Sequence, residues 1–210
     1  MKSFLSRIAL ALTLGLSLMA APIAQAADTA YDLVDPIQPS DTPGKIEVLE
    51  FFAYTCTHCK AIEPLVQKWV PTLPEGVAFK SVPVAFNASM RDLQKLYYAL
   101  EAIDRLDLHP AVFHAIHDEH QRLFNASAII DWVAGQGVDR QAFTDAFNSF
   151  GVQTRVARAD ELVKAYRIDG TPSFAIGGRY VTSPSHTGTY QSAINQADML
   201  VKQLLAEEKK

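Results

Sequence analysis

The chain has 210 residues, of which 49% are hydrophobic and 20% are charged, and its formal net charge is −4. This composition is that of an ordinary globular protein, and the acidic balance gives no argument for a protein that binds nucleic acid. The sequence contains no internal repeat and no low-complexity tract.

The first 26 residues have the pattern of a secretory signal peptide. Lys2 and Arg7 form a positively charged start, residues 8–19 are apolar, and residues 24–26 read Ala-Gln-Ala, an A-x-A cleavage site. The apolar stretch is too short for a membrane span, and no later segment is long and uncharged enough to be one. We therefore expect cleavage near Ala26 and a mature protein that works outside the cytoplasm, where disulfides persist.

The only two cysteines, Cys56 and Cys59, stand between a predicted strand and a predicted helix. Residues 45–52 are apolar and β-branched, as in a buried central strand, and the apolar positions of residues 57–69 recur at helical spacing. Cys56 is therefore expected at a helix N-terminus, where free N–H groups and the helix dipole favour its thiolate. A C-x-x-C sequence between a strand and a helix is typical of a thioredoxin-type redox site.

Two structural explanations for the cysteine pair compete with redox chemistry. A structural zinc site needs four ligands, and His58 lies within the same turn as the two cysteines, where it is poorly placed to complete the set. A structural disulfide that closes so short a loop constrains the unfolded chain little. We therefore favour a redox function for this pair.

The other predicted elements complete an α/β fold. The strand at residues 77–84 should pair in parallel with the central strand, through a right-handed crossover. Gly177 and Gly178 separate two short strands and so predict a hairpin. The expected strands are 31–34, 45–52, 77–84, 173–176 and 179–181, and the expected helices of this part are 57–69, 152–166 and 189–207.

Between the third strand and the helix at 152–166, the pattern becomes helical throughout. Ser89 with Asp92 resembles a capping box for the first helix of this block, and Asp139 caps its last. Asn87 and Asn125 each begin a glycosylation sequon but are interpreted as helix caps. The first expected helix has an apolar stripe of Leu93, Leu96, Tyr97 and Leu100. The three expected helices that follow it are 110–120, 128–134 and 140–150.

Taken together, these features resemble the DsbA family of periplasmic thiol:disulfide oxidoreductases. The resemblance rests on the signal peptide, the Glu-Phe-Phe of residues 50–52, the Cys-Thr-His-Cys of residues 56–59, the helical insertion, the Gly-Thr-Pro of residues 170–172 before the hairpin, and the final helix. It implies a thioredoxin-like α/β fold with an inserted all-helical domain. The domains would then be the signal peptide at 1–26, a thioredoxin-like domain at 27–86 and 152–210, and the insertion at 87–151.

The resemblance also implies roles for individual residues. Cys56 would be the exposed, attacking cysteine and Cys59 its buried partner in a redox-active disulfide. His58 matches the histidine of the family's dipeptide and would be a catalytic residue, whose imidazole favours the Cys56 thiolate. Thr57 stands where a proline is more often found and would belong to the substrate-binding residues. Pro172 matches a cis-proline that shapes the substrate groove, with Thr171 before it; the alternative is an ordinary trans turn proline.

Glu50 matches the acidic residue that the family places beneath the site, where it would accept the proton of Cys59. The alternative is a glutamate on the outer surface of the strand. Alternation puts Glu50 on one face with Val48 and Phe52, which is an apolar setting, and burial would make it hold its proton more tightly. Glu63, one turn after Cys59, is expected to be a solvated helix residue.

Four histidines, His109, His114, His117 and His120, cluster in the insertion, and two of them could share a helix face. A metal site is one interpretation of these histidines, but no convincing set of carboxylate ligands accompanies the four side chains. We expect exposed histidines and no metal.

The resemblance implies that the Cys56–Cys59 disulfide is donated to reduced secreted proteins in the periplasm. A DsbB-type membrane quinone-linked oxidase would restore the disulfide, with no cofactor in the chain itself, which is expected to be a monomer. One alternative is a disulfide isomerase or reductase, although residues 27–45 are too few for the N-terminal dimerisation domain of the dimeric isomerases. Another is a peptide-binding or chaperone module without enzymatic activity.

Overall fold

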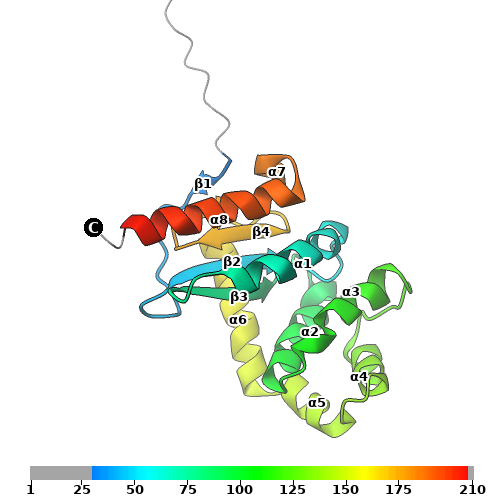
Figure 1. Cartoon of the computed structure of the whole chain (residues 1–210). Helices are drawn as coiled ribbons and strands as arrows, with labels where there is room; N and C mark the ends of the chain where they lie inside the picture. The colour runs from blue at the N-terminus through cyan, green and yellow to red at the C-terminus, as the bar shows by residue number, and fades with distance from the viewer. Residues whose placement is uncertain (1–29, 208–210) are drawn as a thin grey trace, which may run out of the picture.

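The computed structural model describes residues 30–207, so the predicted signal peptide lies outside the described residues. Within this range the chain forms one mixed sheet with helices on both faces and a group of helices to one side (Figure 1). No helix of residues 30–207 combines the length and the apolar character needed to cross a bilayer.

The sheet has the strand order β1-β5-β4-β2-β3. β2 pairs in parallel with β3, as the sequence predicted, and antiparallel with β4. All seven residues of β2 are buried, which agrees with its nearly continuous apolar sequence and its interior position. The strands are β1 (Asp32–Leu33), β2 (Ile46–Phe52), β3 (Val77–Pro83), β4 (Ser173–Ile176) and β5 (Tyr180–Thr182).

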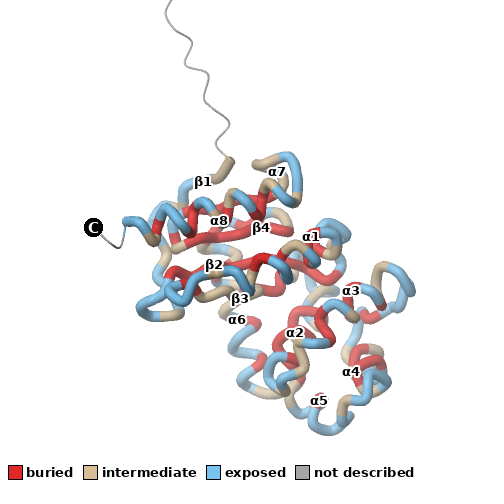
Figure 2. The backbone as a smooth tube through the Cα atoms, in the orientation of Figure 1, coloured by how far each residue is buried: buried red, intermediate tan, exposed pale blue. Residues whose placement is uncertain are grey.

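Helices α1 and α8 cover one face of the sheet, and α6 with α2 lies against the other. The burial map shows β2 and β4 as buried, and buried stretches that alternate with exposed ones along α8 and α2 (Figure 2). The helices are α1 (Thr57–Trp69), α2 (Arg91–Ala102), α3 (His109–His117), α4 (Ala126–Gly135), α5 (Arg140–Phe147), α6 (Phe150–Ala165), α7 (Pro184–Thr187) and α8 (Tyr190–Glu207), with 3-10 turns at Val70–Thr72, Ala88–Met90 and Leu106–Leu108.

Helices α2 to α5 form the predicted helical insertion, but several of its boundaries differ from those expected. The capping box was wrong, because the Asn87 side chain accepts the N–H of Ser89 and opens a 3-10 turn before α2. The caps at Asn125 and Asp139 are confirmed. Ser149 starts a new helix, since its hydroxyl accepts the N–H of Val152 at 3.1 Å.

As a result α5 ends at Phe147, before the predicted end at 150, and α6 starts at Phe150. Helix α6 therefore crosses the predicted domain boundary at residue 151, and the division into domains stays a prediction. The short helix α7 was not expected. Helix α3 ends at His117, three residues earlier than the predicted helix.

The β4–β5 hairpin is confirmed, with positive φ angles of 58° at Gly177 and 71° at Gly178. A Cβ atom at Gly178 would lie 2.0 Å from the carbonyl oxygen of Gln38, so only glycine fits there. The peptide bond between Thr171 and Pro172 is cis, as predicted, and a second cis bond precedes Pro36.

Candidate active site

Cys56 occupies the N-cap position of α1, directly after the loop that follows β2. Its N–H donates to the Ala53 carbonyl at 3.0 Å, which closes the turn, and its Sγ accepts the N–H of Cys59 at 3.2 Å. The first cysteine therefore lies at the N-terminal end of the helix, and the second cysteine lies one turn further along it. The two sulfurs are not joined in this structure, and Cys56 is partly exposed whereas Cys59 is only 1% exposed.

The two sulfurs have opposite acidities. The hydrogen bond from the Cys59 thiol is the main cause that lowers the pKa of Cys56 from 9.0 to about 5. Burial opposes this effect, while hydrogen bonding from Thr171 and from the backbone N–H groups of Cys59 and His58 adds to it. Burial, with the neighbouring Cys56, raises the pKa of Cys59 far above its ordinary value. Cys56 is therefore the thiolate of the pair and Cys59 the thiol.

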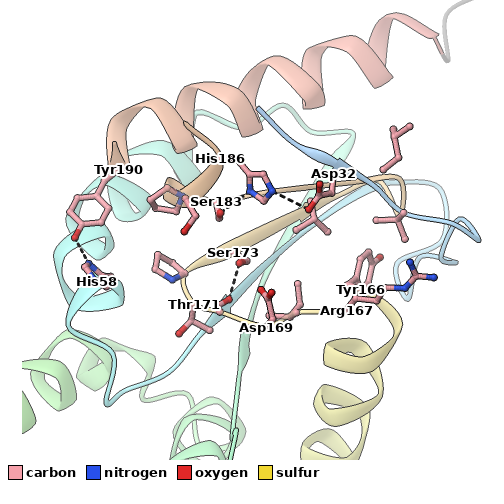
Figure 3. A pocket seen from close by; sticks show the side chains of 18 of the residues that line it. Asp32, His58, Tyr166, Arg167, Asp169, Thr171, Ser173, Ser183, His186 and Tyr190 are labelled. Atoms are coloured by element: carbon pink, nitrogen blue, oxygen red, sulfur yellow. Dashed lines mark hydrogen bonds and ion pairs between the residues drawn. The ribbon is translucent and has the colours of Figure 1, made fainter. Parts of the chain in front are cut away.

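The segment before β4 reaches the redox site through Thr171, the residue before Pro172. Cys56 Sγ is 3.2 Å from the carbonyl oxygen of Thr171. Thr171 and Pro172 also line a cavity of about 1080 Å³ that continues past β1 and α7 (Figure 3). The structure thus brings together the four predicted residues Cys56, Cys59, Thr171 and Pro172. Thr57 is exposed and does not line this cavity.

The imidazole of His58 contacts helix α8. Its Nδ1 lies 2.7 Å from the hydroxyl of Tyr190, the first residue of α8, and the two rings stand at one end of the cavity (Figure 3). The expected effect of this imidazole on the Cys56 thiolate stays a prediction. It is the backbone N–H of His58 that reaches the sulfur.

A polar network that sequence reasoning missed crosses the same cavity. His186 Nδ1 is 2.8 Å from the Ser183 hydroxyl, and its Nε2 is 3.0 Å from Asp32 Oδ2 (Figure 3). The network joins β1 to α7 and fixes one wall of the cavity. Its members come from segments far apart in the sequence, and no local pattern pointed to them.

Glu50 is buried in β2, with only 2% of its surface exposed, and accepts a hydrogen bond from the Ser81 hydroxyl at 3.0 Å. Burial is the main cause that raises the pKa of Glu50 to about 8, the negative charge of Glu63 adds to it, and the Ser81 hydrogen bond opposes it. At neutral pH this carboxyl group is therefore mostly protonated, as a proton donor and acceptor within the protein should be.

Glu63 was wrongly predicted to be solvated. It is buried, its Oε2 lies 3.5 Å from His109 Nε2, and its Oε1 accepts a hydrogen bond from Gln67. The signal was present in the spacing, because Glu63 follows Cys59 by four residues and so shares its helix face.

The histidine prediction was also partly wrong. His109 is buried, and His117 is partly buried against the loop before Cys56. His114 is exposed beside Glu119, and His120 lies beyond the end of α3 with a φ of 55°. Within residues 30–207, no three His, Cys, Asp or Glu side chains are grouped as a metal site would need.

Comparison with known proteins agrees with this geometry. The chain matches the family model described as a DSBA-like thioredoxin domain over residues 72–195, and the model described as thioredoxin over residues 38–96. The thiol:disulfide interchange protein DsbA of Bordetella pertussis is 54% identical over 200 residues, which cover 94% of this chain and 96% of that protein. The corresponding protein of Burkholderia cepacia is 40% identical, with coverage of 97% and 98%.

Solved structures give the same picture. The crystal structure of DsbA from Pseudomonas aeruginosa is similar with a TM-score of 0.83 and 34% identity, covering 86% of this chain and 95% of that one. The oxidoreductase NmDsbA1 from N. meningitidis is similar with a TM-score of 0.76 and 28% identity, covering 86% and 94%. These similarities confirm the predicted thioredoxin-like fold with a helical insertion.

Proposed function

Because this chain belongs to the DsbA family of thiol:disulfide oxidoreductases, we propose that it works as an oxidase, which donates a Cys56–Cys59 disulfide to reduced secreted proteins. The observation that carries this proposal is the opposite acidity of the two sulfurs. A thiolate stabilised at Cys56 is present only in the reduced protein, so the dithiol state is favoured. A protein whose dithiol state is favoured gives its disulfide away.

The reaction has two exchange steps. A substrate thiolate attacks the Cys56 sulfur, the Cys56–Cys59 bond breaks, and Cys59 leaves as a thiolate that takes up a proton. A second substrate thiolate then attacks the substrate sulfur of the mixed disulfide, and Cys56 leaves as a thiolate. The substrate has lost two electrons and gained a disulfide, and the enzyme has gained two electrons and become a dithiol.

The remaining predicted site residues have supporting roles in this proposal. Glu50, buried and mostly protonated at neutral pH, exchanges a proton with Cys59 during the first step. Thr171 and Pro172 line the cavity in which the substrate peptide lies, and Thr57, which is exposed and follows Cys56 in the chain, contacts the substrate beside it. His58 supplies a backbone N–H to the sulfur and one wall of that cavity.

The cellular setting is proposed on the same grounds. The N-terminal pattern supports export to the periplasm, with cleavage near Ala26. A DsbB-type membrane quinone-linked oxidase would then remove the two electrons from the enzyme dithiol. We propose that the protein acts as a monomer on extended substrate segments.

The test is electron transfer to a defined substrate. Oxidised protein is mixed with reduced, unfolded ribonuclease A, and the thiols of both partners are counted by alkylation and mass spectrometry. We expect one ribonuclease disulfide for each enzyme disulfide lost. An enzyme disulfide that stays intact would contradict the proposal, and efficient repair of scrambled ribonuclease by the reduced protein alone would indicate an isomerase.

Replacing His58 with alanine is expected to raise the pKa of Cys56 by less than about one pH unit, because the backbone N–H remains when the imidazole is lost. Thiolate absorbance during a pH titration measures the change. Tyr190→Phe is the matched control, since it releases the imidazole without removing it. A pKa that returns toward 9.0 in His58→Ala would show that the imidazole does stabilise the thiolate.

A further inference from the structure

Helix α3 contacts the loop before Cys56 through two of its histidines. Tyr54 stands two residues before Cys56, and its carbonyl oxygen lies 2.8 Å from His117 Nε2. The hydroxyl of the same tyrosine lies 2.7 Å from His109 Nδ1. One residue of the redox loop is thus held by one helix of the insertion at both its backbone and its side chain.

On the Tyr54 side, both contacts are buried. Tyr54 is 2% exposed, and its ring packs edge-on against Phe113 of α3, with the ring centres 5.1 Å apart. The ring of His117 stacks on the same phenylalanine, Phe113, with the ring centres 6.2 Å apart. In such a setting a lost hydrogen bond leaves a buried carbonyl without a partner, which costs more than the bond itself contributes.

The position of Tyr54 bears directly on Cys56. The hydrogen bond from the Cys56 N–H to the Ala53 carbonyl closes a turn whose two central residues are Tyr54 and Thr55. A shift of the Tyr54 carbonyl therefore moves the turn and the sulfur that follows it. The hydrogen bonds that stabilise the thiolate depend steeply on distance and angle, so a small shift weakens them.

A second link ties α3 to the same helix end. Lys60 in the first turn of α1 forms an ion pair with Asp118, the residue directly after α3. The redox helix and its preceding loop are therefore both fastened to the C-terminal half of α3.

We propose that His117 and His109 are positioning residues for Cys56, and that α3 belongs functionally to the redox site. By holding Tyr54, they keep the Cys56 sulfur at the N-terminus of α1, within reach of its hydrogen-bond donors. Because a carbonyl can only accept, His117 donates its Nε2–H, which fixes its tautomer. This inference rests on the proposed role of Cys56 as the attacked sulfur.

The test compares His117→Ala with His117→Gln, whose amide can still donate to the Tyr54 carbonyl. His114→Ala is the matched control, because His114 lies on the same helix but is exposed, and its imidazole pairs with the acidic side chains of Asp118 and Glu119 rather than with Tyr54. The measurements are the Cys56 pKa, from thiolate absorbance, and the dithiol–disulfide equilibrium with glutathione. Both report on the sulfur rather than on the fold.

We expect His117→Ala to raise the Cys56 pKa and to move the glutathione equilibrium about three- to tenfold toward the disulfide, as loss of one buried hydrogen bond predicts. His117→Gln should restore most of the wild-type value, and His114→Ala should match the wild type. Tyr54→Phe, which removes only the hydroxyl bonded to His109, should give a smaller change in the same direction. It also keeps the test open if His117→Ala does not fold.

Two results would overturn the inference. One is an unchanged pKa and equilibrium in both His117→Ala and Tyr54→Phe, even with lower thermal stability of both redox forms, which would leave the histidines a purely structural role. The other is an equal effect of His117→Gln and His117→Ala. Alkylation of the wild type distinguishes failure of this inference from failure of the proposed function. If Cys59 reacts before Cys56, the proposed role of Cys56 is wrong, independently of the His117 variants.

Discussion

Replacing Cys59 with serine is expected to accumulate substrate proteins on Cys56 as stable mixed disulfides. In the variant, the Cys56 thiolate attacks a substrate disulfide, one substrate sulfur leaves as a thiolate, and the other stays bonded to Cys56. Serine cannot displace it, because the resolving sulfur is gone. Non-reducing gels of protein made in an oxidising compartment should show at least a tenfold increase in adducts over the wild type, since the step that removes them is lost.

Cys56→Ser is the matched control. Its remaining sulfur, Cys59, is buried and holds its proton, so it should trap almost nothing. Adducts trapped equally well by the two variants would contradict the assignment of the attacking cysteine. Adducts that form on Cys59 alone would reverse it.

The sheet and the redox helix could be predicted from the sequence because their signals are local. The apolar run of β2, the helical spacing after Cys56 and the paired glycines of the hairpin each fix one element by short-range chemistry. The favoured thiolate at Cys56 was predicted from one position, the helix N-terminus, which the structure reproduces. The roles of the two cysteines came from the resemblance. A resemblance over the whole chain supplied the order of the elements.

The surroundings of the site could not be predicted in the same way, because they depend on how distant segments pack. The burial of His109 and Glu63 arises where α3 meets α1, and neither segment alone shows which of its polar residues the other will cover. The His58–Tyr190 contact joins the first turn of α1 to the first residue of α8. Ser149 was missed for a different reason, since two adjoining helical patterns hid the cap between them.

The reduced protein is expected to be more stable than the disulfide form at neutral pH, by an amount that falls as the pH falls. The pKa of Cys56 is lowered from 9.0 to about 5 in the folded dithiol protein, with the hydrogen bond from the Cys59 thiol as the first cause. A group with a lowered folded pKa contributes stability that is complete above 9.0 and is lost as the pH falls through about 5. The disulfide form has no thiolate and lacks this contribution.

The size of this stability difference depends on how far the working pH lies above the folded pKa of Cys56. Between pH 5 and pH 7 such a group would gain about 2.7 kcal/mol, and screening at the partly exposed sulfur should reduce this to roughly 1–2 kcal/mol. Urea unfolding of both redox forms from pH 4 to pH 8 measures the difference. Chain closure by the disulfide adds a term to that difference, but this term does not depend on pH.

Glu50 acts in the opposite direction. Its folded pKa is raised to about 8, mainly by burial, so its contribution to stability is present below its ordinary pKa and is lost as the pH rises through about 8. It is present in both redox forms, so taking their difference removes it. The stability difference should therefore increase from pH 5 to pH 7. Cys56→Ser forms no disulfide and has no thiolate at this position, so the stability of the reduced wild type relative to this variant should show the same increase. A difference that stays constant between pH 4 and pH 8 would show that the thiolate of Cys56 does not drive the oxidation.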